Sequence, residues 1–244
     1  MFIIFFFPSP AKAVTEISGT IYSNTVWTME NSPYVINSNL IISASTTLTI
    51  EPGVVVKFHY SISKLDVYGT LNANGTNENK IYFTSYKDDA IGGDTNADGN
   101  TSTPLPKDWR QIILYPGANA NLNYSILRYG GNYSSYCPNY TCYGVINNKG
   151  NLNLTNSEIA TNYQYGIYQT AGTSNISASI IDNHTQVGIQ VSAGNTTISN
   201  STVSNSTRGI NVSGNSNLTL NNNIFAHNII DADIYATVNF THSN

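Results

Sequence analysis

Four tripeptides that recur at one fixed spacing read Asn153-Leu154-Thr155, Asn175-Ile176-Ser177, Thr197-Ile198-Ser199 and Thr219-Leu220-Asn221. In each of them an aliphatic residue stands between two short polar residues. Alternation of polar and apolar residues is the pattern of a half-buried β-strand. The tripeptides therefore predict a strand that recurs with a fixed period.

Neighbouring positions keep the same spacing. Apolar residues recur at Ile159, Ile181, Val203 and Phe225, and polar residues recur at Ser157, Ser179, Ser201 and Asn223. Glycine–aliphatic steps recur at 144–145, 166–167, 188–189 and 209–210, the last one residue short. A fixed period of about 22 residues is typical of solenoids. We therefore predict an all-β fold, a right-handed parallel β-helix of about eight to ten coils with about 22 residues per coil.

The first half of the chain follows this pattern with two interruptions. Leu48 and Leu71 keep the period to within one residue. The steps from 81–83 to 112–114 and from Leu127 to Ile159 are each longer by almost half a period. The extra residues indicate loop insertions near 86–108 and 128–143. We expect an N-terminal cap at 14–45 and the β-helix at 46–244, and the abrupt stop after 239–244 leaves open a truncated C-terminus.

Residues 1–13 predict a secretory signal peptide. Phe and Ile fill positions 2–7, prolines follow at 8 and 10, and Ala11-Lys12-Ala13 has the form of a cleavage site, although no basic residue precedes the apolar run. The alternative, a buried N-terminal strand, is disfavoured by the prolines. The run is shorter than the roughly 20 apolar residues of a membrane span. We therefore expect a secreted or cell-surface protein with no transmembrane span in the mature chain.

Composition narrows the classes of partner. Only 10% of residues are charged, whereas an average soluble protein has about 25%. The 10 Lys and Arg residues do not form a basic patch, so we expect no nucleic-acid partner. Cys137 and Cys142 lack the second pair of ligands that a metal site needs. In an exported chain they predict a local disulfide that pins one loop.

Several stretches resemble a known family. Leu48-Thr49-Ile50-Glu51-Pro52-Gly53-Val54-Val55-Val56-Lys57-Phe58 resembles the signature of exported right-handed parallel β-helix repeat proteins with the pectin-lyase-like fold. The segments 69–76 and 81–85 and the pair Asp108-Trp109 are similar to steps that follow in that family. The resemblance implies this fold and an extracellular location. It does not fix an activity, because such proteins include adhesins, surface-layer components and polysaccharide-active enzymes.

The first insertion suggests a calcium site. Alternate acidic and amide side chains from 94 to 98, followed by Gly99, fit the start of a calcium-binding loop. The loop is not an EF-hand, because Leu105 stands where the bidentate Glu belongs. The predicted Ca²⁺ ligands are Asp88, Asp89, Asp94, Asn96, Asp98 and Asn100. The alternative is a solvated acidic turn without an ion.

Two carboxylates are candidates for catalysis. Glu158 and Asp182 are expected to point outward from adjacent rungs, roughly 8 Å apart, which suits an inverting glycosidase, and His184 is close in sequence. The motifs typical of uronate lyases and galacturonases of this fold are missing. The simpler interpretation is two surface charges that keep the chain soluble.

Tyrosines favour binding over catalysis. Their rings have flat apolar faces and a polar tip, which suit contacts with sugars and with other proteins. The candidate ligand-binding residues are Tyr136, Tyr140, Tyr143, Tyr163, Tyr165 and Tyr168. Packing of the loop against the solenoid is the alternative. A third hypothesis is ice binding by outward Thr, Ser and Asn pairs, which we disfavour because the pairs are mixed.

The sequence therefore predicts a non-catalytic extracellular surface module. Its expected partner is a polysaccharide or a neighbouring cell-surface component, as for an adhesin or a surface-layer protein. The alternative is a polysaccharide-cleaving enzyme, a glycoside hydrolase or lyase, that uses Glu158 and Asp182.

Overall fold

A computed structural model describes residues 14–131 and 144–240, with side chains up to residue 236. The predicted signal peptide at 1–13 and the predicted disulfide between Cys137 and Cys142 lie outside these residues. Within the described part, no helix has the length and apolar character needed to cross a membrane.

The described chain is almost entirely β-structure, with one short 3₁₀ helix, η1, at Met29–Asn31. The strands are β1 (Thr15–Ile21), β2 (Thr25–Trp27), β3 (Tyr34–Ile42), β4 (Thr47–Ile50), β5 (Val55–Phe58), β6 (Lys64–Val67), β7 (Thr70–Asn74), β8 (Ile81–Ser85), β9 (Gln111–Leu114), β10 (Asn119–Asn123), β11 (Ser125–Arg128), β12 (Gly144–Asn148), β13 (Asn151–Thr155), β14 (Glu158–Ala160), β15 (Tyr165–Gln169), β16 (Thr173–Ser177), β17 (Ile180–Asp182), β18 (Val187–Ser199), β19 (Thr202–Ser204), β20 (Arg208–Asn221), β21 (Ile224–Ala226), β22 (Ile230–Ile234) and β23 (Thr237–Phe240).

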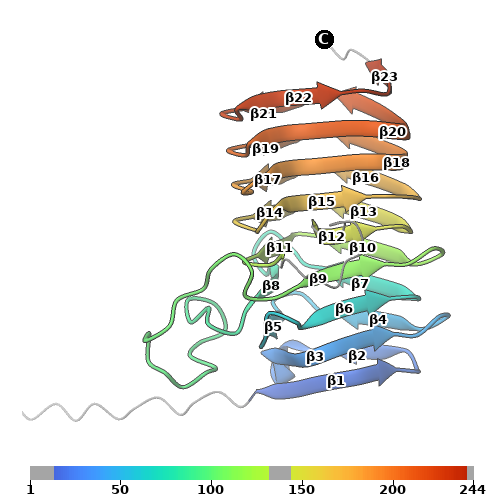
Figure 1. The fold of residues 1–244 in the computed structure, drawn as a ribbon. Helices are drawn as coiled ribbons and strands as arrows, with labels where there is room; N and C mark the ends of the chain where they lie inside the picture. Colours follow the sequence, from blue (N-terminus) through green and yellow to red (C-terminus); the bar gives the residue numbers. More distant parts are fainter. Residues whose placement is uncertain (1–13, 132–143, 241–244) are drawn as a thin grey trace, which may run out of the picture.

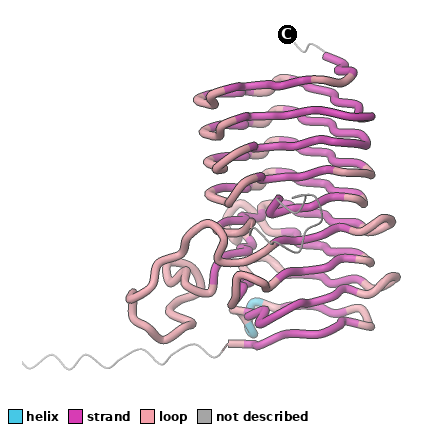
Figure 2. The backbone as a smooth tube through the Cα atoms, in the orientation of Figure 1, coloured by secondary structure: helices cyan, strands magenta, loops and turns pink. Residues whose placement is uncertain are grey.

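Parallel pairing arranges these strands in three sheets stacked around one axis (Figure 1; Figure 2). Sheet A contains β1, β3, β6, β9, β12, β15, β18, β20 and β22. Sheet B contains β2, β4, β7, β10, β13, β16, β18, β20 and β23. Sheet C contains β1, β3, β5, β8, β11, β14, β17, β19 and β21. Strands β1, β3, β18 and β20 each turn a corner and belong to two sheets, and the predicted parallel β-helix is confirmed.

The predicted apolar columns form the core. Leu154, Ile176 and Ile198 stand in register in sheet B, and Ile159 and Ile181 do so in sheet C. All five are buried. Stacking identical positions on successive rungs removes apolar side chains from water without a large globular interior.

Two details of the predicted register were wrong. Ile146, not Val145, pairs with Ile167 in sheet A, so that step is one residue shorter than the predicted period. Residues 81–83 and 112–114 do not share a column, because β8 belongs to sheet C and β9 to sheet A. The first insertion nevertheless lies between these two strands, where the sequence placed it.

Polar ladders line the corners. At the corner between sheets B and C, Ser157 Oγ accepts the Ser125 amide at 3.0 Å, and Ser179 Oγ accepts the Ser157 amide at 3.2 Å. At the corner between sheets C and A, Ser206 Oγ accepts the His184 amide at 3.3 Å. Buried backbone amides need such partners, so these columns stabilise the turns.

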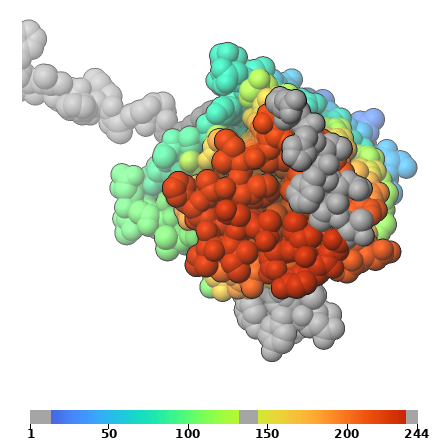
Figure 3. Space-filling view, turned by 90° about the horizontal axis from the view of Figure 1, so that it is seen from above, coloured from blue at the N-terminus to red at the C-terminus, as the bar shows by residue number. Residues whose placement is uncertain are grey.

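Both insertions connect a strand of sheet C to a strand of sheet A. Residues 86–110 join β8 to β9, and residues 129–143 join β11 to β12. The first projects sideways from the stack, as the views along and across the axis show (Figure 1; Figure 3). Residues 14–45 supply β1 to β3, which pair in parallel with later rungs; a capping role for this segment stays a prediction.

Candidate functional site

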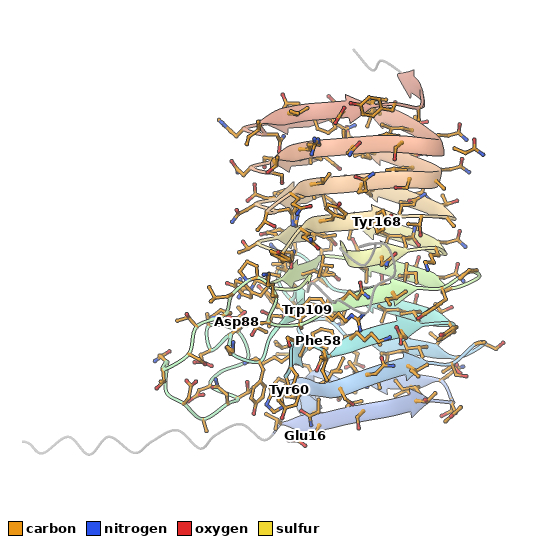
Figure 4. All side chains as sticks on the ribbon, viewed as in Figure 1. Glu16, Phe58, Tyr60, Asp88, Trp109 and Tyr168 are labelled. Atoms are coloured by element: carbon orange, nitrogen blue, oxygen red, sulfur yellow. The ribbon has the colours of Figure 1, made fainter. Side chains whose placement is uncertain are left out.

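The outer face of sheet A carries a column of large and polar side chains in register. Strand residues alternate between the two faces, and the inward positions here are the buried aliphatic residues. The outward column consists of Asp66, Ile113, Asn147, Tyr168, Gln190, Asn211 and Asp233. Tyr168 marks its middle on β15 (Figure 4).

Three predicted tyrosines lie at this face or at its edge. The rings of Tyr165 and Tyr168 meet edge to face, with centroids 5.7 Å apart. Tyr163, in the turn before β15, lies under Lys107, whose Nζ is 3.8 Å from the ring centroid. Burial raises the pKa of the Tyr165 hydroxyl. The other three predicted tyrosines, Tyr136, Tyr140 and Tyr143, lie outside the described residues.

The same face holds buried acceptor oxygens without a hydrogen-bond donor. They are Asp66 Oδ1, Asn147 Oδ1 and Asn211 Oδ1 in the column, and Gln111 Oε1 beside it. Leaving a buried acceptor without a partner costs about 1–3 kcal/mol. Asp66, Gln111 and Asn147 are at most 6% exposed, so an external ligand does not reach their oxygens.

Charged and aromatic pairs border the column. Lys64 Nζ lies 2.6 Å from Asp66 Oδ2, and Arg208 Nε lies 3.0 Å from Asp233 Oδ2. At the edge towards sheet B, Tyr68 and Tyr115 stack with centroids 4.0 Å apart and an interplanar angle of 9°. The face therefore offers hydrogen-bonding groups between aromatic surfaces.

Sequence reasoning found the tyrosines of this face but missed the rest of the column. A signal was present, because Asn147, Tyr168, Gln190, Asn211 and Asp233 follow one another at steps of one full period or one residue less. Their side chains differ in type, so no repeated letter draws attention to the column.

The acidic insertion brings three carboxylates together. Asp89, Asp94 and Asp98 each place one oxygen within 4.8 Å of the others. Both Asp94 oxygens accept backbone amides, from Asp98 at 3.2 Å and from Gly99 at 2.9 Å. Asp89 Oδ1 and Asn96 Oδ1 are buried and have no donor. Hard cations such as Ca²⁺ take oxygen ligands of these kinds.

Three of the predicted ligands, Asp88, Asn96 and Asn100, lie outside this group of three carboxylates. Asp88 Oδ2 pairs with Arg128, at 2.7 Å from Nη2 and 3.0 Å from Nε, and accepts the Thr84 hydroxyl at 2.5 Å. Asn100 is exposed and has a left-handed φ of 79°. Asp88 therefore anchors the base of the insertion to β11, whereas Asp89, Asp94 and Asp98 are the residues that could hold an ion.

Lys57 ties the insertion to sheet C. Its buried Nζ donates to the Gly93 carbonyl at 2.7 Å and to Thr95 Oγ1 at 2.9 Å. Burial lowers the pKa of Lys57 from its ordinary value of 10.5 to about 8, although nearby aspartates oppose the shift. Burial and the charge of Asp94 raise the pKa of Asp89.

The candidate catalytic residues lie on the outer face of sheet C. Glu158 pairs with Ile180 and Ala160 with Asp182, so the two carboxylates are one rung and two residues apart. Asp182 Oδ1 accepts hydrogen bonds from Ser204 and Asn205, both at 2.7 Å.

His184 is turned away from these carboxylates. It is buried inside the solenoid, with Nε2 3.1 Å from the Ile159 carbonyl oxygen, and burial lowers its pKa to about 4. It is therefore a neutral group of the interior that an external substrate does not reach. A catalytic role for Glu158 and Asp182 stays a prediction.

The fold and register define the class of protein, a parallel β-helix solenoid. A family profile describing the right-handed β-helix region matches residues 112–244, more than half of the chain. The chain belongs to this right-handed β-helix family. Searches of curated proteins and of solved structures found no match.

Proposed function

We propose that this protein is an extracellular, non-catalytic β-helix module that binds a polysaccharide, free or on a neighbouring cell surface, across the outer face of sheet A. The observation that carries the proposal is the Tyr165–Tyr168 pair within a column of polar side chains that includes the partly exposed Asn211 and Asp233. Sugar hydroxyls donate hydrogen bonds, and the apolar faces of sugar rings pack on tyrosines.

The dimensions of this face suit a chain-like ligand. Successive rungs repeat about every 4.8 Å, so the column from Asp66 to Asp233 extends over many rungs. Both insertions lead directly into strands of sheet A, the first into β9 and the second into β12. A polymer lying along the axis would contact the partly exposed members of the column, Tyr168, Asn211 and Asp233, and these weak contacts would add up.

Calcium is part of the proposal as a structural ion. Asp89, Asp94 and Asp98 would bind Ca²⁺, and the buried Asp89 Oδ1 and Asn96 Oδ1, which have no donor, support this assignment. The ion would neutralise three carboxylates and hold the insertion against sheet C. Export would follow from the predicted signal peptide and would place the module where millimolar calcium sites function.

A binding panel tests the proposal. The purified chain is titrated with plant, algal and microbial polysaccharides in the presence of calcium, and binding and released oligosaccharides are both measured. We expect at least one polysaccharide to bind without release of products. Tyr168→Ala should weaken that binding about tenfold or more, because loss of one aromatic anchor costs on the order of 1–2 kcal/mol.

Tyr22→Ala is the matched control, because Tyr22 is an exposed tyrosine in the turn after β1. It should bind as the unchanged protein does. Equal losses in both variants, or no binding by any polysaccharide, would contradict the proposal. Release of oligosaccharides would favour the enzyme hypothesis, and Glu158→Gln would then show whether that carboxylate takes part.

A further inference from the structure

The outer face of sheet B has a shallow hollow, which we call the sheet B hollow. It lies over β7, β10 and β13, and these are consecutive strands of the sheet (Figure 1). Its volume of about 370 Å³ is at the lower end of the range for small-molecule sites, roughly 300–1,000 Å³. None of the polar side chains that line it is buried. They are Asn72, Asn74, Asn121, Asn123, Asn153 and Thr155.

Asparagine is concentrated around this hollow. On β7, β10 and β13 the outward positions of sheet B carry Asn at seven of nine places, and the exceptions are Thr70 and Thr155. On the next two rungs, Asn175 and Asn195 are the Asn residues among six such places, and Thr or Ser holds the others. Asn is disfavoured in strands, whereas Thr is favoured. The concentration is therefore not explained by strand formation, and it points to a role for the amide groups themselves.

Hydrogen bonds between rungs hold the amides of the hollow in fixed orientations. Asn121 Nδ2 donates to Asn72 Oδ1 at 2.8 Å, and Asn153 Nδ2 donates to Asn121 Oδ1 at 2.9 Å. Thr155 Oγ1 donates to Asn123 Oδ1 at 2.9 Å. Side chains that are already ordered lose less conformational freedom when a ligand binds, so the hollow is preorganised.

These amides keep hydrogen-bonding capacity for a ligand. Each amide has two N–H protons and an oxygen with two lone pairs. Asn121 uses one proton and one lone pair in its bonds to the adjacent rungs, so one of each remains. Within the described residues, the Asn123 side chain bonds through its oxygen alone, which leaves both of its N–H protons. The hollow therefore presents donors and acceptors side by side.

This chemistry favours an uncharged ligand that is rich in hydroxyl groups. A hydroxyl donates and accepts hydrogen bonds at once, which matches an amide that offers both groups. No charged or aromatic side chain of the described residues lines the hollow, so an ion would lose hydration there without gaining a counter-charge. We propose that the sheet B hollow binds one neutral sugar unit, as a site separate from the tyrosines of sheet A. Hydrogen bonds alone would hold the sugar, and we expect binding in the millimolar range.

Side-chain amide signals in NMR spectra of the isotope-labelled chain test this inference. The chain is titrated with glucose, galactose, mannose and N-acetylglucosamine, as free sugars and as the end units of short oligosaccharides, and binding of either form supports the site. We expect at least one sugar to shift the Asn121 and Asn123 signals until they saturate. Asn121→Thr should weaken this binding about tenfold or more, because it removes the central amide. The variant should fold, because Thr49 and Thr197 occupy the same column on other rungs.

Asn217→Thr is the matched control, because Asn217 is an outward amide of sheet B that donates to Asn195 Oδ1 at 2.9 Å but lies outside the hollow. It should bind the sugar as the unchanged protein does, and melting temperatures verify that both variants are folded. The inference fails if no sugar shifts the Asn121 signal, if both variants lose binding equally, or if glucuronate binds as tightly as glucose. Polysaccharide binding by sheet A is a separate result, since Tyr168→Ala should leave the response of Asn121 to the sugar unchanged.

Discussion

His184 lies inside the solenoid at a position where the adjacent rungs place Asn162 and Ser206. Its Nε2 faces the Ile159 carbonyl oxygen, so the neutral tautomer with the proton on Nε2 fits, while Nδ1 has no partner. Protonation would bury a charge that the Ile159 carbonyl and Asp182 offset only in part, and burial accordingly lowers the pKa of His184 from 6.5 to about 4. This single side chain gives the fold a dependence on pH.

The direction of that dependence follows from proton binding. As pH falls below 6.5 the unfolded chain protonates this histidine, while the folded chain does not until about pH 4. The free energy of unfolding therefore falls by about 3 kcal/mol as the pH drops from 6.5 to about 4, at roughly 1.4 kcal/mol per pKa unit. His184→Asn should remove this part of the pH dependence, because Asn occupies the same column in the rung of Asn162. Denaturant unfolding from pH 7 to pH 4 measures it, and identical slopes for both proteins would contradict the assignment.

At the scale of elements, the 86–110 insertion is held from three directions. Lys57 binds its backbone from β5, Arg128 pairs with Asp88 from β11, and Trp109 stacks on Phe58 with ring centroids 4.0 Å apart (Figure 4). These anchors fix the two ends of the insertion, but the cluster of Asp89, Asp94 and Asp98 brings like charges together. A bound cation would relieve this repulsion.

Calcium should therefore stabilise this element. We expect calcium to raise the melting temperature of the unchanged protein, measured against the chelated protein, and we expect Asp94→Asn to reduce that rise by more than half. Glu78→Gln is the control, because Glu78 is an exposed carboxylate outside the cluster, and it should leave the rise intact. A melting temperature that does not respond to calcium would contradict the structural role of the ion.

The sequence predicts some elements of this molecule better than others. The columns through Leu154 and Ile159 were predictable because inward positions need aliphatic side chains on every rung, which leaves a repeated letter at a fixed step. The outward column through Tyr168 accepts many side chains, and the insertions place Asp66, Ile113 and Asn147 at irregular distances along the sequence. Only the parallel pairing in the structure shows that these residues adjoin.

At the scale of the whole molecule, the three outer faces differ in chemistry while they share one core. Sheet A combines acceptors, tyrosines and paired charges; sheet B is neutral and regular; sheet C holds the first insertion and the outward carboxylates. Because each rung contacts only its neighbours, a face can change without disturbing the opposite one. The close approach of Asp94 and Asp98 could be anticipated from their spacing in the sequence, but the two distinct faces follow from the assembled solenoid.

The outer face of sheet A is the polysaccharide-binding surface that we propose. Hydroxyl-radical footprinting with the polysaccharide that binds best tests this assignment, because tyrosine reactivity reports contact at each ring. We predict that Tyr165 and Tyr168 lose reactivity severalfold on binding, whereas the exposed Tyr22 keeps its reactivity. Unchanged reactivity at Tyr165 and Tyr168, with protection elsewhere, would contradict the claim.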